Sequence, residues 1–375
     1  MGSCTKVLDY NTSMIMLNLS REMVTEMQKS LLYSSVDKLM IGRILPLVFA
    51  MGLAGNLSFL FTMLRVKWMR TVTNYYLANL AVADLLFLLV VVGEKIIAYS
   101  SSQLKGDILF GHVAGCILTN FLRRITFYAS LSLVTLVSLE RFYAICRPVQ
   151  HRMLNGKKGT FQLVAICWVL SALFALILIP SGSNLCITEI IWLNVDGYQD
   201  LPNKLSACHA VNNNWTIASE GLLTVPFVIA LVTNTFLYSS IIMNLHLRAS
   251  SKSAKSTQSI EIRNQVARML VINGTVFFLC LAPFQLASFT RMVRNALGLR
   301  SLLDSLSLTA IVWFFRVLVY LNSVINPIVY TATSPRYRHG FFIAFTCGDA
   351  EDRKKYSRGS QAATSATEKT CNTKI

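Results

Sequence analysis

Seven long apolar blocks, separated by short polar stretches, dominate the hydrophobic pattern of the chain. Each block supplies the roughly 20 apolar residues that a helix needs to cross a bilayer. Inside hydrocarbon, backbone polar groups must be satisfied within the segment, which favours helices. We therefore predict an all-α membrane protein, a seven-transmembrane helix bundle, with spans near Met40–Leu64, Tyr75–Ala98, Ala114–Ile145, Phe161–Ile179, Gly221–Leu245, Met269–Thr290 and Leu306–Thr331.

Composition excludes an ordinary soluble protein. Of the 375 residues, 54% are hydrophobic and 14% are charged, whereas average globular chains carry about 25% charged residues. A net charge of +17 would suggest nucleic acid as the partner of a soluble protein, but in a membrane protein it reflects basic cytoplasmic loops, so we expect no nucleic acid. Most basic residues lie in the C-terminal tail and in the loops after odd-numbered spans. The positive-inside rule then places the N terminus outside the plasma membrane and the C terminus in the cytosol.

This orientation divides the chain into four parts. Residues 1–39 form an extracellular tail, 40–333 the bundle, 334–347 an amphipathic stretch and 348–375 a cytoplasmic tail. Glycosylation sequons fall in the segments assigned outside, at Asn11, Asn18 and Asn214. Three cysteines, Cys116, Cys186 and Cys208, also lie on the outer side, which is oxidising. We expect one disulfide from Cys116 to one of the other two.

Polar residues at the middle of several spans form one set. An ionised side chain there costs roughly 3 kcal/mol or more, so it calls for a function or a partner. Asp84 lies mid-span, and oxygen-bearing side chains occupy comparable depth on other spans, at Asn56, Ser130, Asn322, Ser323 and Asn326. A carboxylate with several oxygen donors is suited to a small cation such as Na⁺. A water-filled hydrogen-bond network is the alternative, and spacing alone does not separate the two.

Cations predominate in the outer half of the spans. Arg123, Arg316 and Lys95 lie at this depth, where Glu94 is the one acidic residue. This excess indicates a pocket that accepts an anion. Alternatively, Glu94 satisfies one cation while the others extend to the outer interface. Arg291, near the membrane edge, fits either interpretation.

Charged residues and prolines also mark the inner halves of the helices. Glu140 and Arg141 are adjacent at the inner end of the third span, where pairing lowers the cost of placing the arginine near the membrane. Pro283 and Pro327 each remove a helix hydrogen bond and favour a kink, which suggests hinged helices. The alternative is that prolines are simply commoner in membrane helices.

Other membrane functions are less well supported. A transporter or channel remains an alternative, but the sequence shows no inverted repeat or paired interrupted helices. An intramembrane enzyme would need a nucleophile–base pair or metal ligands within the spans, and none of the five histidines lies mid-span. We therefore do not expect an enzyme.

Taken together, these motifs resemble a class A (rhodopsin-like) G-protein-coupled receptor over roughly residues 40–347. The matching residues are Gly55-Asn56, Leu80–Asp84, Cys116, Glu140-Arg141-Phe142, Trp168, Phe277 with Cys280 and Pro283, and Asn326–Tyr330. After them, the stretch beginning at Pro335 resembles the short amphipathic eighth helix of that family. Each motif is weak alone, but the complete set in order on the correct spans is specific.

The resemblance implies roles for several residues. It implies an allosteric Na⁺ site, with no other cofactor, at Asp84, Ser130, Asn322, Ser323 and Asn326. It also implies a Cys116–Cys208 disulfide and palmitoylation of Cys347. The switch that opens toward a heterotrimeric G protein maps onto Glu140, Arg141, Tyr238 and Tyr330. The sixth helix would swing outward about Pro283, with Pro327 as a second hinge.

Further partners follow from the same resemblance and from the tail. Membrane lipids surround such a bundle, and receptor kinases and arrestin would act on serines and threonines of the tail. The final three residues, Thr373–Ile375, fit a ligand of a PDZ protein.

The ligand class is indicated by single positions. Arg123 replaces the aspartate that amine receptors use, and Tyr320 replaces the lysine of opsins. The long second outer loop resembles that of neuropeptide receptors. A peptide with an acidic residue or free carboxylate would suit a pocket formed by Glu94, Lys95, Arg123, Arg291 and Arg316. A small anionic or lipid ligand is the alternative.

Overall fold

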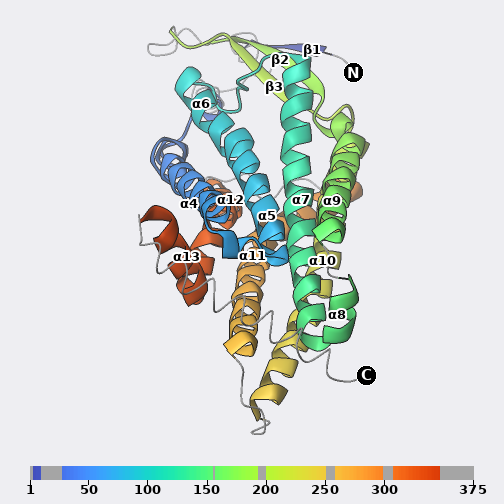
Figure 1. The fold of residues 1–375 in the computed structure, drawn as a ribbon. Helices are drawn as coiled ribbons and strands as arrows, with labels where there is room; N and C mark the ends of the chain where they lie inside the picture. The colour runs from blue at the N-terminus through green and yellow to red at the C-terminus, as the bar shows by residue number, and fades with distance from the viewer. Residues whose placement is uncertain are drawn as a thin grey trace, which may run out of the picture.

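A bundle of long helices with a small β-sheet at one end makes up the computed structural model (Figure 1). It describes residues 3–9, 28–154, 157–192, 200–250, 258–298 and 307–346. Several sequence-based predictions fall outside these residues and stay predictions: glycosylation at Asn11 and Asn18, palmitoylation of Cys347, and the tail contacts with arrestin, kinases and a PDZ protein.

The seven predicted spans are all present as helices, which confirms the bundle. Among the described residues, six helical segments are individually long and apolar enough to cross a membrane. The second span is divided by a π-helical turn at Leu88–Gly93, and a similar turn at Met40–Ile44 interrupts the first. In order, the spans are α3–α4 (Ser35–Leu39, Leu45–Arg65), α5–α6 (Val72–Phe87, Glu94–Ser101), α7 (Val113–Cys146), α9 (Lys157–Ile177), α10 (Asn213–Ser250), α11 (Gln258–Leu297) and α12 (Ser307–Thr333).

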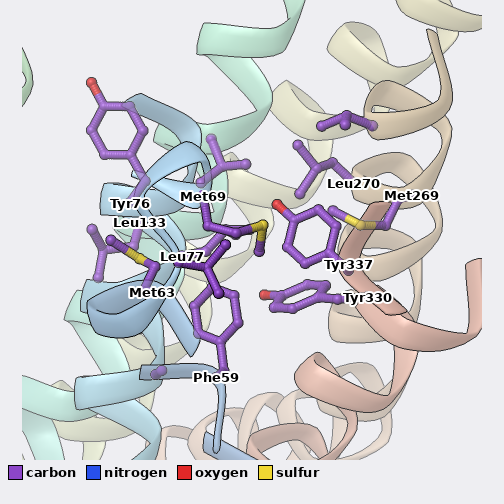
Figure 2. Packing of buried hydrophobic residues seen from close by; sticks show 14 of the residues in the cluster. Phe59, Met63, Met69, Tyr76, Leu77, Leu133, Met269, Leu270, Tyr330 and Tyr337 are labelled. Atoms are coloured by element: carbon purple, nitrogen blue, oxygen red, sulfur yellow. The ribbon is translucent and has the colours of Figure 1, made fainter. Parts of the chain in front are cut away.

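Two short helices lie at the end of the bundle opposite the sheet (Figure 1). Helix α8 (Pro148–Leu154) follows α7, and α13 (Pro335–Phe345) follows α12, where the sequence predicts an eighth helix. The Tyr337 hydroxyl of α13 donates a hydrogen bond to Asn74 of α5, and its ring lies 5.6 Å from that of Tyr330. Phe59 of α4 completes this buried aromatic group (Figure 2). The eighth helix is therefore fixed to the bundle by its buried face.

The sheet is a feature that the hydrophobic pattern does not predict. Its strand order is β1 (Ser3–Asp9), β2 (Asn184–Ile191) and β3 (Lys204–His209). The hairpin β2–β3 is antiparallel, whereas β1 pairs with β2 in parallel. The strand at the start of the chain therefore lies against the loop that joins α9 to α10. We call this end of the bundle the sheet end.

Helices α10 and α11 pack closely along their length. Gly274 of α11 lies against Tyr238 of α10, and a Cβ at this glycine would overlap the tyrosine hydroxyl. Nearer the sheet end, a Cβ at Gly221 of α10 would lie 3.2 Å from the sulfur of Met292. These two contacts set the antiparallel register of the pair: residues early in α10 face residues late in α11.

Candidate functional site

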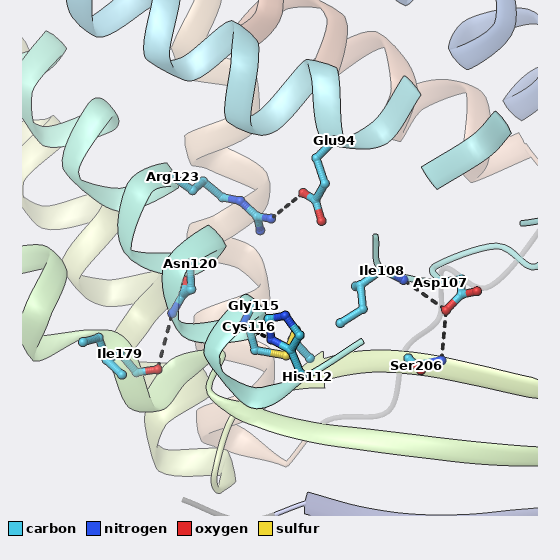
Figure 3. Close-up of a disulfide and its surroundings, with 11 residues drawn as sticks. Glu94, Asp107, Ile108, His112, Gly115, Cys116, Asn120, Arg123, Ile179 and Ser206 are labelled. Atoms are coloured by element: carbon cyan, nitrogen blue, oxygen red, sulfur yellow. Dashed lines mark hydrogen bonds and ion pairs between the residues drawn. A yellow bond between two sulfur atoms is a disulfide. The ribbon is translucent and has the colours of Figure 1, made fainter. Parts of the chain in front are cut away.

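Three cations and one carboxylate converge in the half of the bundle nearer the sheet. Glu94 at the start of α6 forms an ion pair with Arg123 of α7, with Oε2 and Nη2 3.7 Å apart (Figure 3). Lys95 of α6 lies within the electrostatic influence of Glu94, Arg123 and Arg316 of α12. The Arg123 side chain is 49% exposed, so a ligand can reach it. The structure therefore brings together four of the predicted binding residues, which we call the cation group: Glu94, Lys95, Arg123 and Arg316.

Arg316 is positioned by a chain of contacts that ends on Asp37. Its guanidinium lies over the Trp313 ring, 5.5 Å from the ring centre. The Trp313 indole N–H donates to Asp37 Oδ1 at 2.7 Å, and Lys105 Nζ donates to Oδ2 of the same carboxylate at 2.9 Å. Asp37 is 1% exposed. Sequence reasoning missed this residue, although Ser34 and Asp37 have the spacing of a capping box and form one here.

Arg291 differs from the other predicted cations because both oxygens of a neighbouring carboxylate accept hydrogen bonds from its guanidinium. Its Nε lies 3.1 Å from Glu220 Oε1 and its Nη2 lies 3.4 Å from Oε2. Ser288 supplies a further acceptor at 2.8 Å. Glu220 lies one residue before the predicted fifth span, so the cation excess expected from the sequence does not include its charge. Within the described residues, the charge of Arg291 is therefore compensated and does not add to the excess.

Two disulfides tie the sheet to the bundle and to itself. Cys116 at the start of α7 is bonded to Cys208 of β3, as the family resemblance implies (Figure 3). A second disulfide joins Cys4 of β1 to Cys186 of β2, which the sequence left unassigned. The start of α7 is further fixed by His112, whose Nδ1 accepts a hydrogen bond from Gly115 N at 2.8 Å. The hairpin is thus held against the start of α7, the helix that carries Arg123.

The mid-span polar residues form a buried cluster around Asp84. Asn326 Nδ2 donates to Asp84 Oδ2 at 2.7 Å, and Asn56 Nδ2 donates to the Ser323 carbonyl at 2.8 Å. The side-chain oxygens of Asn56, Asn322 and Asn326 are buried without a hydrogen-bond partner among the described residues. Buried oxygens that still lack a donor suit a hard cation, which takes oxygen ligands. The residues present therefore fit Na⁺, and they fit ordered water by the same chemistry.

The predicted switch residues occupy separate hydrogen-bond groups at the opposite end. Arg141 bonds to the carboxylate of Glu140 and to the Thr73 hydroxyl. The Tyr238 hydroxyl lies 2.8 Å from Ser138 Oγ. Tyr330 is 1% exposed, and its hydroxyl has no partner among the residues described. The structure thus pairs Arg141 with its neighbour but does not join it to either tyrosine.

The remaining predicted residues are placed as follows. Ser130 is buried on α7, and the hinge residues Pro283 and Pro327 lie inside α11 and α12, which continue through them as helices. Asn214 lies exposed in the first turn of α10, near the sheet.

Comparisons with known proteins show which family this chain resembles. The family described as 7 transmembrane receptor (rhodopsin family) matches residues 55–330. The thyrotropin-releasing hormone receptor of Ovis aries is 25% identical over 321 residues, which cover 79% of this chain and 75% of the relative. Neuromedin-U receptor 2 of Rattus norvegicus is 27% identical over 303 residues, covering 79% of this chain and 72% of that protein.

Proposed function

The chain belongs to the rhodopsin family of seven-transmembrane receptors, and from this membership we propose that it binds an extracellular peptide and activates a heterotrimeric G protein. The family consists of signalling receptors, and the relatives described above are named for thyrotropin-releasing hormone and neuromedin U. In this proposal the sheet end faces the outside of the cell, and the end that carries Arg141 faces the cytosol.

The excess of positive charge at the sheet end supports a peptide with a carboxylate. Among the described charges that act on Lys95, two are the cations Arg123 and Arg316 and one is the carboxylate of Glu94. A guanidinium binds a carboxylate through two parallel hydrogen bonds, which gives both strength and orientation. Interactions between charges are also stronger in a partly buried site than in water. An acidic side chain or the free C terminus of the peptide would therefore complete this site.

Activation requires that the peptide bind one arrangement of the helices better than another, because equal affinity for both would shift nothing. We propose that α11 moves outward about Pro283 when the peptide is bound. That movement separates α11 from α10 at Gly274 and gives the G protein access to Arg141. Arg141 would then leave its contact with Glu140.

The test is a charge reversal in the binding site. Cells expressing the receptor are screened with peptides and small anions, with calcium and cAMP readouts. Arg123→Glu should abolish the response to the agonist found, with surface expression unchanged, because it places a second carboxylate beside Glu94. The matched control is Arg43→Glu, which reverses an exposed cation in the first span, on a helix that carries none of the four clustered charges. Unchanged agonist potency in Arg123→Glu would reject the role of this group.

A small anionic or lipid ligand is the second candidate, because the same charge excess would accept a free carboxylate. The screen separates the two: activation by small carboxylates, with no response to any peptide, would favour the second candidate.

We also propose that Na⁺ acts as an allosteric ion at Asp84, with Ser130, Asn322, Ser323 and Asn326 as its surroundings. The unpartnered oxygens of this cluster support a bound cation, and in our proposal this cation binds one arrangement of the helices better than another. An ion with that preference would change agonist affinity without touching the peptide.

A further inference from the structure

A cavity of about 440 Å³ lies between α10 and α11 in the half of these helices nearer the sheet. Around it, Val225, Val228, Ile229, Leu286 and Phe289 expose between 46% and 67% of their surface. Apolar side chains exposed on the outside of a membrane-spanning bundle face lipid. The cavity therefore borders the bilayer, and it is separate from the cation group, which lies on α6, α7 and α12.

Two buried polar side chains line this apolar cavity without a partner. Gln285 is 3% exposed and Thr224 is 7% exposed. Both side-chain polar atoms of Gln285 and the hydroxyl of Thr224 lack a hydrogen-bond partner among the described residues. Buried polar groups are normally paired, because leaving them unsatisfied costs free energy. These atoms therefore point to a ligand group that both donates and accepts hydrogen bonds.

The charge of the side chains that line the cavity limits the charge that a ligand can carry. No charged side chain is among the described residues that line the cavity. Arg291, next in sequence to the lining residue Met292, has its guanidinium occupied by Glu220 and Ser288. A carboxylate or phosphate would therefore enter without a counter-ion, which is unfavourable in an apolar site. A hydroxyl is neutral, and both an amide and a threonine can bond to it.

The volume of the cavity and the register of α10 against α11 limit the size of the ligand and its position. Ligand pockets range from about 300 to 1,000 Å³, so this one holds a single small molecule. The contacts Gly221–Met292 and Gly274–Tyr238 set the register, in which Thr224 lies nearer the sheet end and Gln285 lies about one turn deeper, near the level of Val228. A hydroxyl bound to both side chains would therefore lie inside the cavity, between the levels of Thr224 and Gln285. We propose that the cavity between α10 and α11 binds a membrane lipid of sterol size through a single hydroxyl group on Gln285 and Thr224. This site does not depend on the identity of the peptide.

Photoaffinity labelling in lipid nanodiscs tests the proposal. The full chain is reconstituted in phosphatidylcholine with a trace of photoreactive cholesterol, and labelled peptides are identified by mass spectrometry. We expect labelling within Thr224–Ile229 and Ala282–Met292, displaced by excess unlabelled cholesterol but not by oleic acid. Gln285→Leu should weaken the apparent affinity about tenfold through loss of its hydrogen bonds.

A pair of matched tryptophan variants distinguishes the cavity from the general lipid surface. Val228→Trp fills the cavity and should abolish displaceable labelling. Val232→Trp makes the same change one turn further along α10, at a position that is 64% exposed and outside the cavity, and should leave labelling intact. Thermal melting of each purified variant checks that it is folded. Labelling that survives Val228→Trp, that both variants lose, or that oleic acid displaces as well as cholesterol does would overturn the proposal.

Discussion

Asp37 connects three parts of the sheet end through one carboxylate: the start of the first span, Lys105 before α7, and Trp313 of α12. Because Trp313 also lies beneath Arg316, a residue outside the binding site helps to position a residue inside it. Its contribution should therefore appear in both stability and agonist potency.

Asp37→Asn should lower the free energy of unfolding by about 1–3 kcal/mol, because Lys105 loses its anionic partner and the Trp313 hydrogen bond loses its charged acceptor. The measurement is the melting temperature of the purified receptor, together with agonist potency. The control is Glu189→Gln, which removes the exposed pair with Lys204 and should cost at most about 1 kcal/mol. Equal melting temperatures for the two variants would contradict this role for Asp37.

Asp84→Asn should remove the dependence of agonist affinity on Na⁺, because it takes away the only charge of the cluster while keeping the size of the side chain. The measurement is agonist binding in membranes with NaCl compared with choline chloride at equal ionic strength. Ser171→Ala provides the control: among the residues that the structure describes, this buried serine of α9 bonds to its own helix, at the Cys167 carbonyl. Persistence of the Na⁺ effect in Asp84→Asn would exclude an ion at this site.

The sequence predicts which cations lie within or beside the spans but not how each is paired. Arg123 lies inside the third predicted span and Arg291 at the edge of the sixth, yet of the two only Arg291 has a complete carboxylate partner. That partner, Glu220, belongs to another helix, and helical periodicity says nothing about contacts between helices. The disulfide between Cys4 and Cys186 is not predicted for a related reason: it joins two segments that lie far apart in the sequence.

The pair α10–α11 carries the close contact that the proposed movement must break. Gly274→Ala should shift Tyr238 away from Ser138 and destabilise the receptor by about 1–3 kcal/mol, as overpacking of a filled interior does. Melting temperature and basal signalling are the measurements. Gly221→Ala is the control, because its neighbour is the flexible end of Met292 and can move. Greater damage from Gly221→Ala would show that the Tyr238 contact is not the limiting one.

The sequence predicts those parts of the helices that lie in the hydrocarbon core of the bilayer. The seven spans follow from apolar length, but α10 and α11 extend well past the predicted boundaries at residues 221 and 269. Hydropathy detects only the part of a helix that lies in the bilayer, whereas the polar turns beyond it are held by their own hydrogen bonds. The sequence does not predict the strands, because β1 pairs with a segment about 180 residues away. A local hydrophobic pattern gives no information about such a distant pairing.

Across the whole molecule, the two disulfides make one covalent path from the start of the chain to α7. Cys4→Ser should remove the protection of the β1 amides from hydrogen exchange, because among the described strands β1 pairs with β2 alone. The Cys116–Cys208 bond should remain, as peptide mapping under non-reducing conditions would show. Asn11→Gln, which also alters the N-terminal segment, should leave that protection unchanged. Full protection of β1 in Cys4→Ser would mean that backbone pairing alone holds the strand.

This covalent path has a practical consequence for anyone who handles the protein. A fluorescent or affinity tag placed before Ser3 is attached through Cys4, the hairpin and Cys116 to the same helix that carries Arg123 near one end and Arg141 near the other. Pulling on such a tag, or immobilising it on a sensor surface, loads that helix directly. Tags for biosensor measurements therefore belong at the other terminus.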